Sequence, residues 1–267
     1  MPFLGTIVSP DNAKIKSVRS LKNRKRVRYR EKRYLIEGAR ALAQALDQGC
    51  QLVLCFHTEA FTSTERGQAL VQALTEGDAG VWQVSPSVMS SMSDTTTPQG
   101  IIAIAPMPEA ETALAMEATL LLVLDSIRDP GNLGTILRTA LATGVEAVLL
   151  SKGCVDPYSP KVVRAGMGAH LPLAIFPMLD WPDIAELVAN KSCFLADAQG
   201  TRTCWDVDWT VPSALFIGGE AYGAGPQAQA LAQYTVRLPM AEGIESLNAA
   251  IATAVFLFEI QRQRQSG

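Results

Sequence analysis

Residues 120–144 read LLLVLDSIRDPGNLGTILRTALATG, and this stretch decides the fold of the second half of the chain. An apolar run ends at Asp125, a Pro-Gly turn follows, and the next apolar pattern predicts a helix from about Gly134 to Thr143. A wholly apolar strand that leads into a helix is typical of a parallel sheet covered on both faces. We therefore predict an α/β fold for this half.

The same alternation of strands and helices extends outward in both directions. In the second half, the apolar runs predict further strands at 147–150, 171–176, 193–198 and 213–218, with helices near 160–166 and 182–189. In the first half they predict helices at 38–46 and 65–74 and strands at 52–56, 81–84 and 101–105. Residues 106–118 between the halves are rich in Pro, Ala and Glu and show no strand pattern. We predict two α/β domains, 1–105 and 119–267, joined by this linker.

Charge is distributed unevenly along the sequence. The whole chain has a net charge of −3, but residues 1–40 carry 12 basic and 3 acidic residues, a net charge of +9 that leaves −12 on the rest. Ile15, Val18 and Leu21 have the spacing of an amphipathic helix, and Tyr29 and Tyr34 interleave with the basic residues that follow. Such a segment suits contacts to phosphates, although a solvated helix face is the simpler alternative.

The cysteines and histidines indicate no disulfide framework and no metal site. The five cysteines form no CxxC pair and are odd in number, so a reducing, cytoplasmic setting is expected. His57 and His170 are too few and too far apart in the sequence to suggest metal ligands. No apolar run reaches the roughly 18 residues of a membrane span, so we expect a soluble protein.

Three segments of the second half place small or polar residues directly after an apolar strand, where open parallel sheets build ligand sites. The first contains Asn132, which could simply cap the helix, and Arg138. A guanidinium in an otherwise apolar helix needs an anionic partner, either a carboxylate of the protein or a phosphate of a ligand. The second segment, ALFIGGEAYGAG at 214–225, has Glu220 in a glycine-rich turn that lacks the nucleotide-phosphate motifs. The third, VRLPMAEGIESLNAAIATAV at 236–255, places Ser246 and Asn248 at the mouth of an apolar helix. Ser246 could simply cap this helix, whereas Asn248, two residues further inside it, needs a partner.

Together the three segments resemble the three motifs of the SpoU (TrmH-like) branch of the SPOUT methyltransferases. NxGxxxRTA lies at 132–140, IGGExxG at 217–223, and LPMxxGxESLNxxxA at 238–252. Residues 9–40 are also similar to the substrate-binding domain that many members carry, so the resemblance covers nearly the whole chain. It implies a small L30e-like α/β RNA-binding domain, followed by an α/β domain whose chain is threaded into a deep trefoil knot, an exception to the usual absence of knots.

The resemblance also implies a cofactor and roles for individual residues. S-adenosylmethionine would be held by backbone groups of the second and third motifs, at Gly218, Gly219, Glu220, Leu238, Pro239, Met240, Ser246 and Leu247. The catalytic set would be Arg138, Asn132, Glu220, Ser246 and Asn248, with Arg138 central. The basic segment would bind the RNA substrate through Lys22, Arg24, Lys25, Arg26, Arg28 and Arg30.

Three functions therefore stay open at this point. The leading prediction is 2′-O-ribose methylation of ribosomal RNA, most simply 23S. The alternatives are the same chemistry on transfer RNA, or a non-catalytic RNA-binding assembly factor with a vestigial cofactor pocket.

The segment Leu247–Ile260 is apolar on nearly every face, which predicts a buried helix that a second subunit covers in a homodimer.

Overall fold

The computed structural model describes residues 3–220 and 223–266, and the chain divides into two compact units. The first unit runs to Pro108 and takes in Tyr158–Leu171 as well. The second contains Glu109–Pro157 and the residues from Pro172 onward. The division at Pro108 falls inside the stretch that the sequence marks as a linker, part of which forms the short helix α7 (Thr112–Glu117). The second-half helix at residues 160–166 thus belongs structurally to the first unit.

The first unit is built on a mixed five-stranded sheet in the order β1-β4-β3-β5-β2. Its strands are β1 (Phe3–Ile7), β2 (Arg33–Glu37), β3 (Leu54–His57), β4 (Gly80–Val84) and β5 (Ile101–Pro106). β5 runs antiparallel to both β2 and β3, whereas β4 is parallel to β1 and β3. The three predicted strands are confirmed, and β1 and β2 are additional because their mixed polarity hides the strand pattern.

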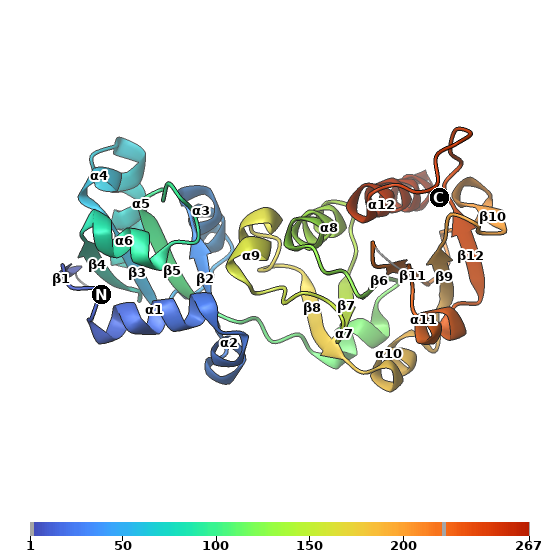
Figure 1. Cartoon of the computed structure of the whole chain (residues 1–267), viewed down its shortest axis with the longest axis horizontal. Helices are drawn as coiled ribbons and strands as arrows, with labels where there is room; N and C mark the ends of the chain where they lie inside the picture. Colours follow the sequence, from blue (N-terminus) through green and yellow to red (C-terminus); the bar gives the residue numbers. More distant parts are fainter. Residues whose placement is uncertain (1–2, 221–222, 267) are drawn as a thin grey trace. The chain divides into compact units, whose positions relative to one another are not determined.

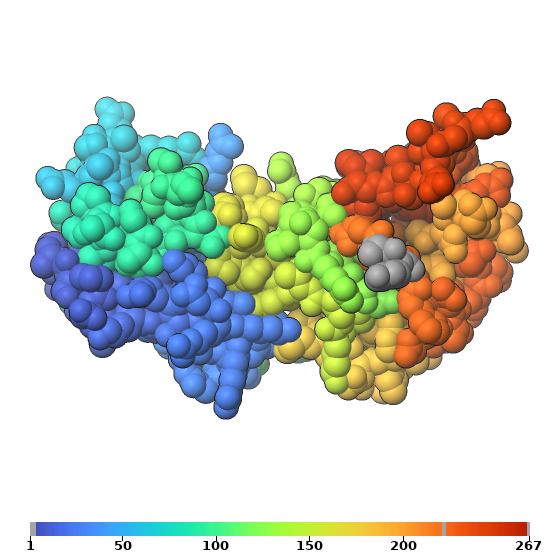
Figure 2. Space-filling model, in the orientation of Figure 1, coloured from blue at the N-terminus to red at the C-terminus, as the bar shows by residue number. Residues whose placement is uncertain are grey.

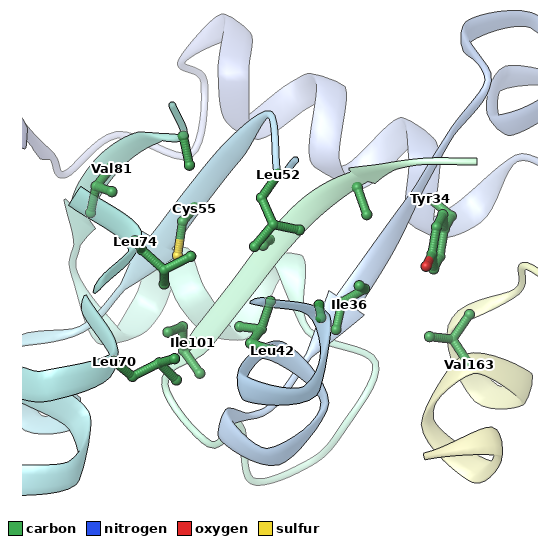
Figure 3. Close-up of a cluster of buried hydrophobic side chains, with 14 of the residues drawn as sticks. Tyr34, Ile36, Leu42, Leu52, Cys55, Leu70, Leu74, Val81, Ile101 and Val163 are labelled. Atoms are coloured by element: carbon green, nitrogen blue, oxygen red, sulfur yellow. The ribbon is translucent and has the colours of Figure 1, made fainter. Parts of the chain in front are cut away.

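Helices cover both faces of this sheet, as Figure 1 shows. They are α1 (Ala13–Asn23), α2 (Lys25–Glu31), α3 (Ala39–Asp47), α4 (Glu59–Thr62), α5 (Glu65–Glu76), α6 (Pro86–Met92) and α9 (Pro160–Gly166). One face packs against Leu42 of α3, Leu74 of α5 and Val163 of α9 (Figure 3). The other face packs against α1 and α6, where Ile15 and Val18 are fully buried as their spacing predicts.

The second unit contains a parallel seven-stranded sheet in the order β10-β12-β9-β11-β6-β7-β8. Its strands are β6 (Leu120–Asp125), β7 (Ala147–Ser151), β8 (Ala174–Leu179), β9 (Ser192–Ala196), β10 (Arg202–Thr203), β11 (Ser213–Gly218) and β12 (Tyr234–Arg237). Every residue of β6 is buried, in agreement with the prediction of a strand covered on both faces. β8 begins at Ala174, three residues after the predicted start, because residues 171–173 still form a turn.

Helices cover both faces of this sheet (Figure 1). The first face carries α7, α10 (Trp181–Val188) and α11 (Pro226–Leu231), whose apolar residues join one core cluster. On the opposite face α8 (Pro130–Ala142) and α12 (Ala249–Ser266) pack against each other. After β12, near one edge of the sheet, the chain returns to its centre, where α12 contacts β11. The expected knotted domain requires such a return.

Two expectations about helix ends need correction. α8 begins at Pro130 and not near Gly134, and Asp129 caps it by accepting a hydrogen bond from the Asn132 backbone N–H. Asn132 therefore lies in the first turn, with its side chain free for another role. Conversely, Asn248 lies before α12 and not inside it, and its Oδ1 accepts hydrogen bonds from the backbone of Ala250 and Ile251. Because Asn248 serves as the cap, Ser246 does not.

The apolar helix α12 is only partly covered within one chain. Leu257 and Ile260 are fully buried, but Ile251 and Phe258 are each 54% exposed. Figure 2 shows this red helix on the surface of the second unit. One apolar face of α12 therefore remains uncovered within a single chain, and its burial by a second subunit stays a prediction. Among the described residues, no helix is long and apolar enough to span a bilayer.

Candidate active site

A cavity of about 610 Å³ opens at the carboxyl ends of β9, β11 and β12. In a parallel sheet all strand ends of one kind share an edge, and ligands bind outside the carboxyl edge. The volume lies in the range of small-molecule and cofactor sites. The cavity is lined by residues 195–198, 217–220, 223–224, Gln229, Leu238, Met240, 246–249, Ala252 and Phe256.

The wall formed by the glycine-rich segment after β11 has no room for side chains. A Cβ on Gly218 would lie 2.2 Å from the Ala224 backbone nitrogen, and one on Gly219 would lie 2.5 Å from the Ser126 carbonyl oxygen. Gly219 and Gly223 exchange two backbone hydrogen bonds of 3.1 and 3.0 Å that close the turn. Only glycine fits at the first two positions, so the backbone itself forms the surface that a ligand meets.

A chain of hydrogen bonds joins the three motif segments. The Asn132 amide Nδ2 donates to Glu220 Oε1 at 2.6 Å, and Asn132 Oδ1 accepts from Asn248 Nδ2 at 3.0 Å. Asn132 comes from the first turn of α8, Glu220 from the glycine-rich turn, and Asn248 from the cap of α12. One asparagine therefore fixes the carboxylate and the helix cap at the rim of the cavity.

Most residues predicted to hold a cofactor line this cavity. Gly218, Gly219, Glu220, Leu238, Met240, Ser246 and Leu247 all do so, whereas Pro239 is not among the lining residues. Of the predicted catalytic set, Glu220, Ser246 and Asn248 line the cavity, and Asn132 reaches it through its bond to Glu220. The individual roles of these residues remain predictions.

Sequence reasoning missed one wall of the cavity. Residues 195–198 at the end of β9, Asp197 among them, and Phe256 from α12 contribute lining that no motif marks. The available signal was positional, because the apolar run CFLADA carries the acidic residue Asp197 near its end, at the carboxyl edge of a predicted parallel strand. Asp197 and Glu220 are the only charged residues among the described lining residues.

Arg138 lies outside the cavity, on the exposed side of α8. Within residues 3–220 and 223–266, no carboxylate forms an ion pair with its guanidinium. Of the two anionic partners that the sequence allows for this arginine, the structure therefore provides no protein carboxylate. Because the guanidinium is exposed to solvent, it requires no partner within the protein, and a contact with a ligand phosphate stays a prediction.

Comparison with known proteins agrees with this geometry. Residues 119–258 match the SpoU rRNA Methylase family, and residues 12–103 match the MRM3-like substrate binding domain. The chain belongs to the SpoU rRNA methylase family. The match covers the cavity, the glycine-rich turn and the three segments that Asn132 joins.

Individual family members resemble this chain over almost its full length. The mitochondrial rRNA methyltransferase 3A of Danio rerio is 35% identical, and the alignment covers 92% of this chain and 67% of that protein. A 23S rRNA (uridine-2′-O)-methyltransferase of Streptomyces viridochromogenes is 28% identical, with coverage of 97% and 93%. The crystal structure of the SpoU methyltransferase AviRb from Streptomyces viridochromogenes, in complex with AdoMet, superposes with a TM-score of 0.87 at 25% identity, covering 96% of this chain and 99% of that one.

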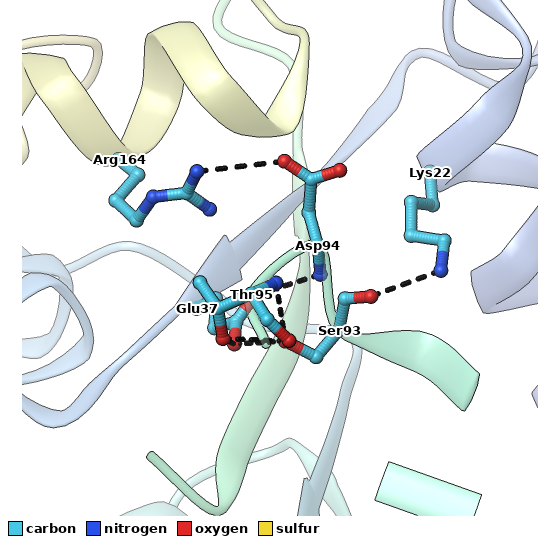
Figure 4. Close-up of polar contacts among 6 residues, drawn as sticks. All are labelled: Lys22, Glu37, Ser93, Asp94, Thr95 and Arg164. Carbon is cyan, nitrogen blue, oxygen red and sulfur yellow. Dashed lines mark hydrogen bonds and ion pairs between the residues drawn. The ribbon is translucent and has the colours of Figure 1, made fainter. Parts of the chain in front are cut away.

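In this SpoU-family chain the predicted RNA-binding residues divide into two groups. Lys22 donates from Nζ to the carbonyl oxygens of Ser91 and Ser93 (Figure 4). Arg28 is buried and donates to the carbonyl oxygens of Leu21 and Lys22 at the end of α1. These two side chains cap helix ends because unpaired carbonyls there need donors.

The other four predicted basic residues lie at the surface of the first unit. Arg24 and Arg26 are exposed, Lys25 lies over the Tyr29 ring at 5.7 Å, and Arg30 pairs with Glu31 at 2.8 Å. An exposed ion pair of this kind is weak and can be exchanged for a phosphate contact. Arg24, Lys25, Arg26 and Arg30 therefore remain accessible to RNA.

Of the tyrosines that interleave with these basic residues, Tyr34 belongs to the core, and Tyr29 is half-buried and packs against it. Tyr34 is fully buried and packs against Tyr158 and His170, with ring centroids 5.2 and 6.3 Å apart. Burial raises the pKa of Tyr34 far above its usual value, so the hydroxyl stays neutral. Tyr29 meets the Tyr158 ring edge-on at 6.4 Å.

Neither metal nor thiol chemistry has a visible centre in the described part of the chain. His57 and His170 are both buried in the first unit, and no described group of three or more His, Cys, Asp or Glu side chains could hold a metal ion. Burial raises the pKa of Cys55 and Cys204 to about 12 and that of Cys193 to about 11. These thiols stay protonated at neutral pH and are poor nucleophiles.

Proposed function

We propose that this protein transfers a methyl group from S-adenosylmethionine to a ribose 2′-hydroxyl of structured RNA, most simply 23S ribosomal RNA. The observation that carries the proposal is the hydrogen-bonded set Asn132, Glu220 and Asn248 at the rim of a glycine-walled cavity. The relatives named as ribosomal RNA and 2′-O-methyltransferases support the substrate class and the acceptor atom.

The cavity suits the proposed cofactor in shape and in charge. S-adenosylmethionine carries a sulfonium and an ammonium group, and the charged residues of the described lining are the two carboxylates Asp197 and Glu220. Backbone groups of Gly218, Gly219, Leu238 and Met240 would hold the rest of the molecule. When bound, the cofactor supplies a methyl group on a positively charged sulfur, which is already a good leaving group.

The residues of the chain then have to orient the ribose and allow its 2′-hydroxyl to lose a proton. The acceptor hydroxyl must lose its proton as it attacks, which requires orientation, charge stabilisation and a proton acceptor. Arginine is a poor base because its pKa exceeds about 12. We assign Arg138 to gripping the neighbouring phosphate and stabilising the developing alkoxide. The proton would pass to a phosphate oxygen, to Glu220 or to water.

The first unit would supply affinity for RNA. Arg24, Lys25, Arg26 and Arg30 offer charges for phosphate contacts, which position a nucleic acid without reading its sequence. Tyr34 is in the core and Tyr29 is half-buried against it, so RNA shape would carry most of the specificity.

The second unit would dimerise through its uncovered apolar face, in a cytoplasmic protein. Ile251 and Phe258 lie seven residues apart on one side of α12, and Ile244 and Leu247 just before the helix are also exposed. A second copy that covers this face would complete the burial that the composition of the helix demands. Size measurement by light scattering is expected to give a dimer, which Phe258→Lys would convert to a monomer.

The proposed activity is tested by incubating the purified protein with tritiated S-adenosylmethionine and total RNA from a strain that lacks the gene. Label in large-subunit ribosomal RNA at a ribose 2′ position, lost in Arg138→Ala and kept in the surface variant Arg262→Ala, is the expected result. Label in transfer RNA would move the substrate. Cofactor binding with no label in any RNA would replace the proposal by an assembly factor.

The role of Arg138 has a sharper test in Arg138→Lys. Lysine keeps the charge but loses the planar fork that grips a phosphate and an alkoxide together. We expect turnover to fall by at least about tenfold with little change in cofactor affinity, and near-normal turnover in this variant would contradict the assignment.

A further inference from the structure

We infer that Asp125 is a positioning residue that holds the two described ends of the cofactor-binding turn, Gly218–Glu220 and Gly223–Gly225, in their binding-competent arrangement. The inference rests on the proposed function, because the ligand of the turn is the proposed cofactor. Asp125 is the last residue of β6, is only 5% exposed, and is not among the residues that line the cavity. Any effect on cofactor binding must therefore act through the turn.

The carboxylate of Asp125 holds the end of the turn by a hydrogen bond, and the strand that carries Asp125 holds the beginning of the turn by pairing with β11. In the parallel pairing of β6 with β11, Asp125 lies opposite Gly218, the residue at which the turn begins. Its Oδ2 accepts a hydrogen bond of 2.7 Å from the backbone N–H of Gly225, where the turn ends. A single residue thus fixes both ends of the segment that carries Gly219, Glu220 and Gly223 into the cavity wall.

The other carboxylate oxygen is held from the opposite side. Asp125 Oδ1 accepts from the hydroxyls of Ser151 at 2.9 Å and Ser126 at 3.1 Å. Ser151, the last residue of β7, is itself buried and accepts from the Ser126 backbone N–H at 3.2 Å. The buried carboxylate is therefore fully hydrogen-bonded and cannot reorient without breaking several bonds, which makes it a rigid anchor for Gly225.

The backbone beneath the turn has a conformation that depends on the same network. Ser126 has a φ of 59°, in the left-handed region that a non-glycine residue rarely adopts. Its carbonyl oxygen lies against Gly219, where a Cβ would approach to 2.5 Å. Because two bonds of the network hold Ser126, the Asp125 cluster also determines the surface on which the glycine turn rests.

The test measures the dissociation constant of S-adenosylmethionine by calorimetry for the wild type and three variants, with thermal unfolding recorded for each. Asp125→Ala removes the acceptor of Gly225, and we expect the dissociation constant to rise by about 10- to 100-fold. Asp125→Asn can still turn a carbonyl oxygen to Gly225 and its amide to Ser151, so we expect at most about a fivefold rise. Ser213→Ala is the matched control, because it removes one hydrogen bond of a buried hydroxyl at the opposite end of β11 and leaves the Asp125 network and the Gly225 bond intact. It is expected to lower the unfolding temperature while changing the dissociation constant by less than about threefold.

The outcomes separate positioning from general destabilisation. Equal losses of affinity in Ser213→Ala and Asp125→Ala, or an Asp125→Ala affinity within twofold of the wild type, would overturn the inference. If Asp125→Ala does not fold, Asp125→Ser takes its place, since a hydroxyl one atom shorter can reach Ser151 but not Gly225. RNA affinity, which the basic helices of the first unit supply, is expected to be unchanged in every variant. A wild-type protein that binds no S-adenosylmethionine would refute the proposed function and this inference with it, whereas binding by the wild type with unchanged affinity in Asp125→Ala would overturn the inference alone.

Discussion

Replacing Asn132 with aspartate is expected to lower kcat/KM for methyl transfer by about 100- to 1000-fold. The bond from Asn132 Nδ2 to Glu220 Oε1 is 2.6 Å long and has a charged acceptor, so its loss costs about 1.5–3 kcal/mol. The new carboxylate would face Glu220 at the same separation, and the repulsion adds at least about 1.5 kcal/mol even in water. The two effects together correspond to two to three decades in rate, at about 1.4 kcal/mol per decade.

The assay compares Asn132→Asp with Asn132→Ala, using tritiated S-adenosylmethionine and the RNA that the wild type labels. Asn132→Ala loses only the hydrogen bonds and is expected to fall by about 10- to 100-fold. A proton shared between the two carboxylates would remove the repulsion, and about 1.5 kcal/mol raises a carboxyl pKa by about one unit from its ordinary value of about 4, so the aspartate variant is expected to recover part of its deficit as the pH falls toward about 5. The alanine variant has no such carboxylate pair and is not expected to recover. Wild-type rates in Asn132→Asp, or parallel pH profiles of the two variants, would refute the reasoning.

Three further predictions concern the parts of the chain that support the site. Arg264 donates to the carbonyl oxygens of three residues just before β6 and β11, so Arg264→Ala is expected to destabilise the protein by about 3 kcal/mol in urea unfolding. Lys152→Ala, which breaks one exposed ion pair with Asp180, is expected to cost under about 1 kcal/mol. Arg28→Ala is expected to destabilise the first unit by about 2–4 kcal/mol without changing the salt dependence of RNA binding. Arg26→Ala is expected to leave the urea midpoint unchanged and to reduce the slope of log binding constant against log salt concentration by about one. Burial lowers the pKa of His57 below that of the unfolded chain, so the wild type is expected to lose stability as pH falls below about 6.5, and His57→Gln is expected to lose less in urea midpoints measured at several pH values.

Much of the fold could be predicted from single segments, because the buried face of a helix or strand requires apolar residues at regular spacing in the sequence. The apolar run 120–125 predicted a strand covered on both faces, and the spacing of Ile15, Val18 and Leu21 predicted the buried face of α1. The edge strands β1 and β2 show no such regular spacing of apolar residues, since they mix polar and apolar residues. The residue patterns of the three motifs were specific enough to identify most of the cavity-lining residues without any knowledge of the strand order.

The roles of the basic residues could not be read in the same way. Lys22, Arg26 and Arg28 look alike in the sequence, yet one caps α6, one is exposed and one caps α1. The difference lies in which backbone carbonyl groups come within hydrogen-bonding distance of each side chain after folding. Every residue has a backbone carbonyl, so the sequence does not distinguish these acceptors. The position of Asp197 in the cavity wall was hidden for a related reason, because it depends on β9 being a neighbour of β11 and β12.

The sequence by itself determined the alternation of strands and helices, the glycines of the cofactor turn and the identity of the polar residues that follow the strands. Only the tertiary structure decided that Asn132 bonds Glu220, 88 residues away, and Asn248, 116 residues away. It also decided that Asp125 reaches Gly225, which lies 100 residues further along the chain. Periodicity reports the environment of one residue along its own element. The pairing of distant residues depends on strand order, because strands brought side by side in a parallel sheet place their carboxyl ends, and the polar residues there, at one edge.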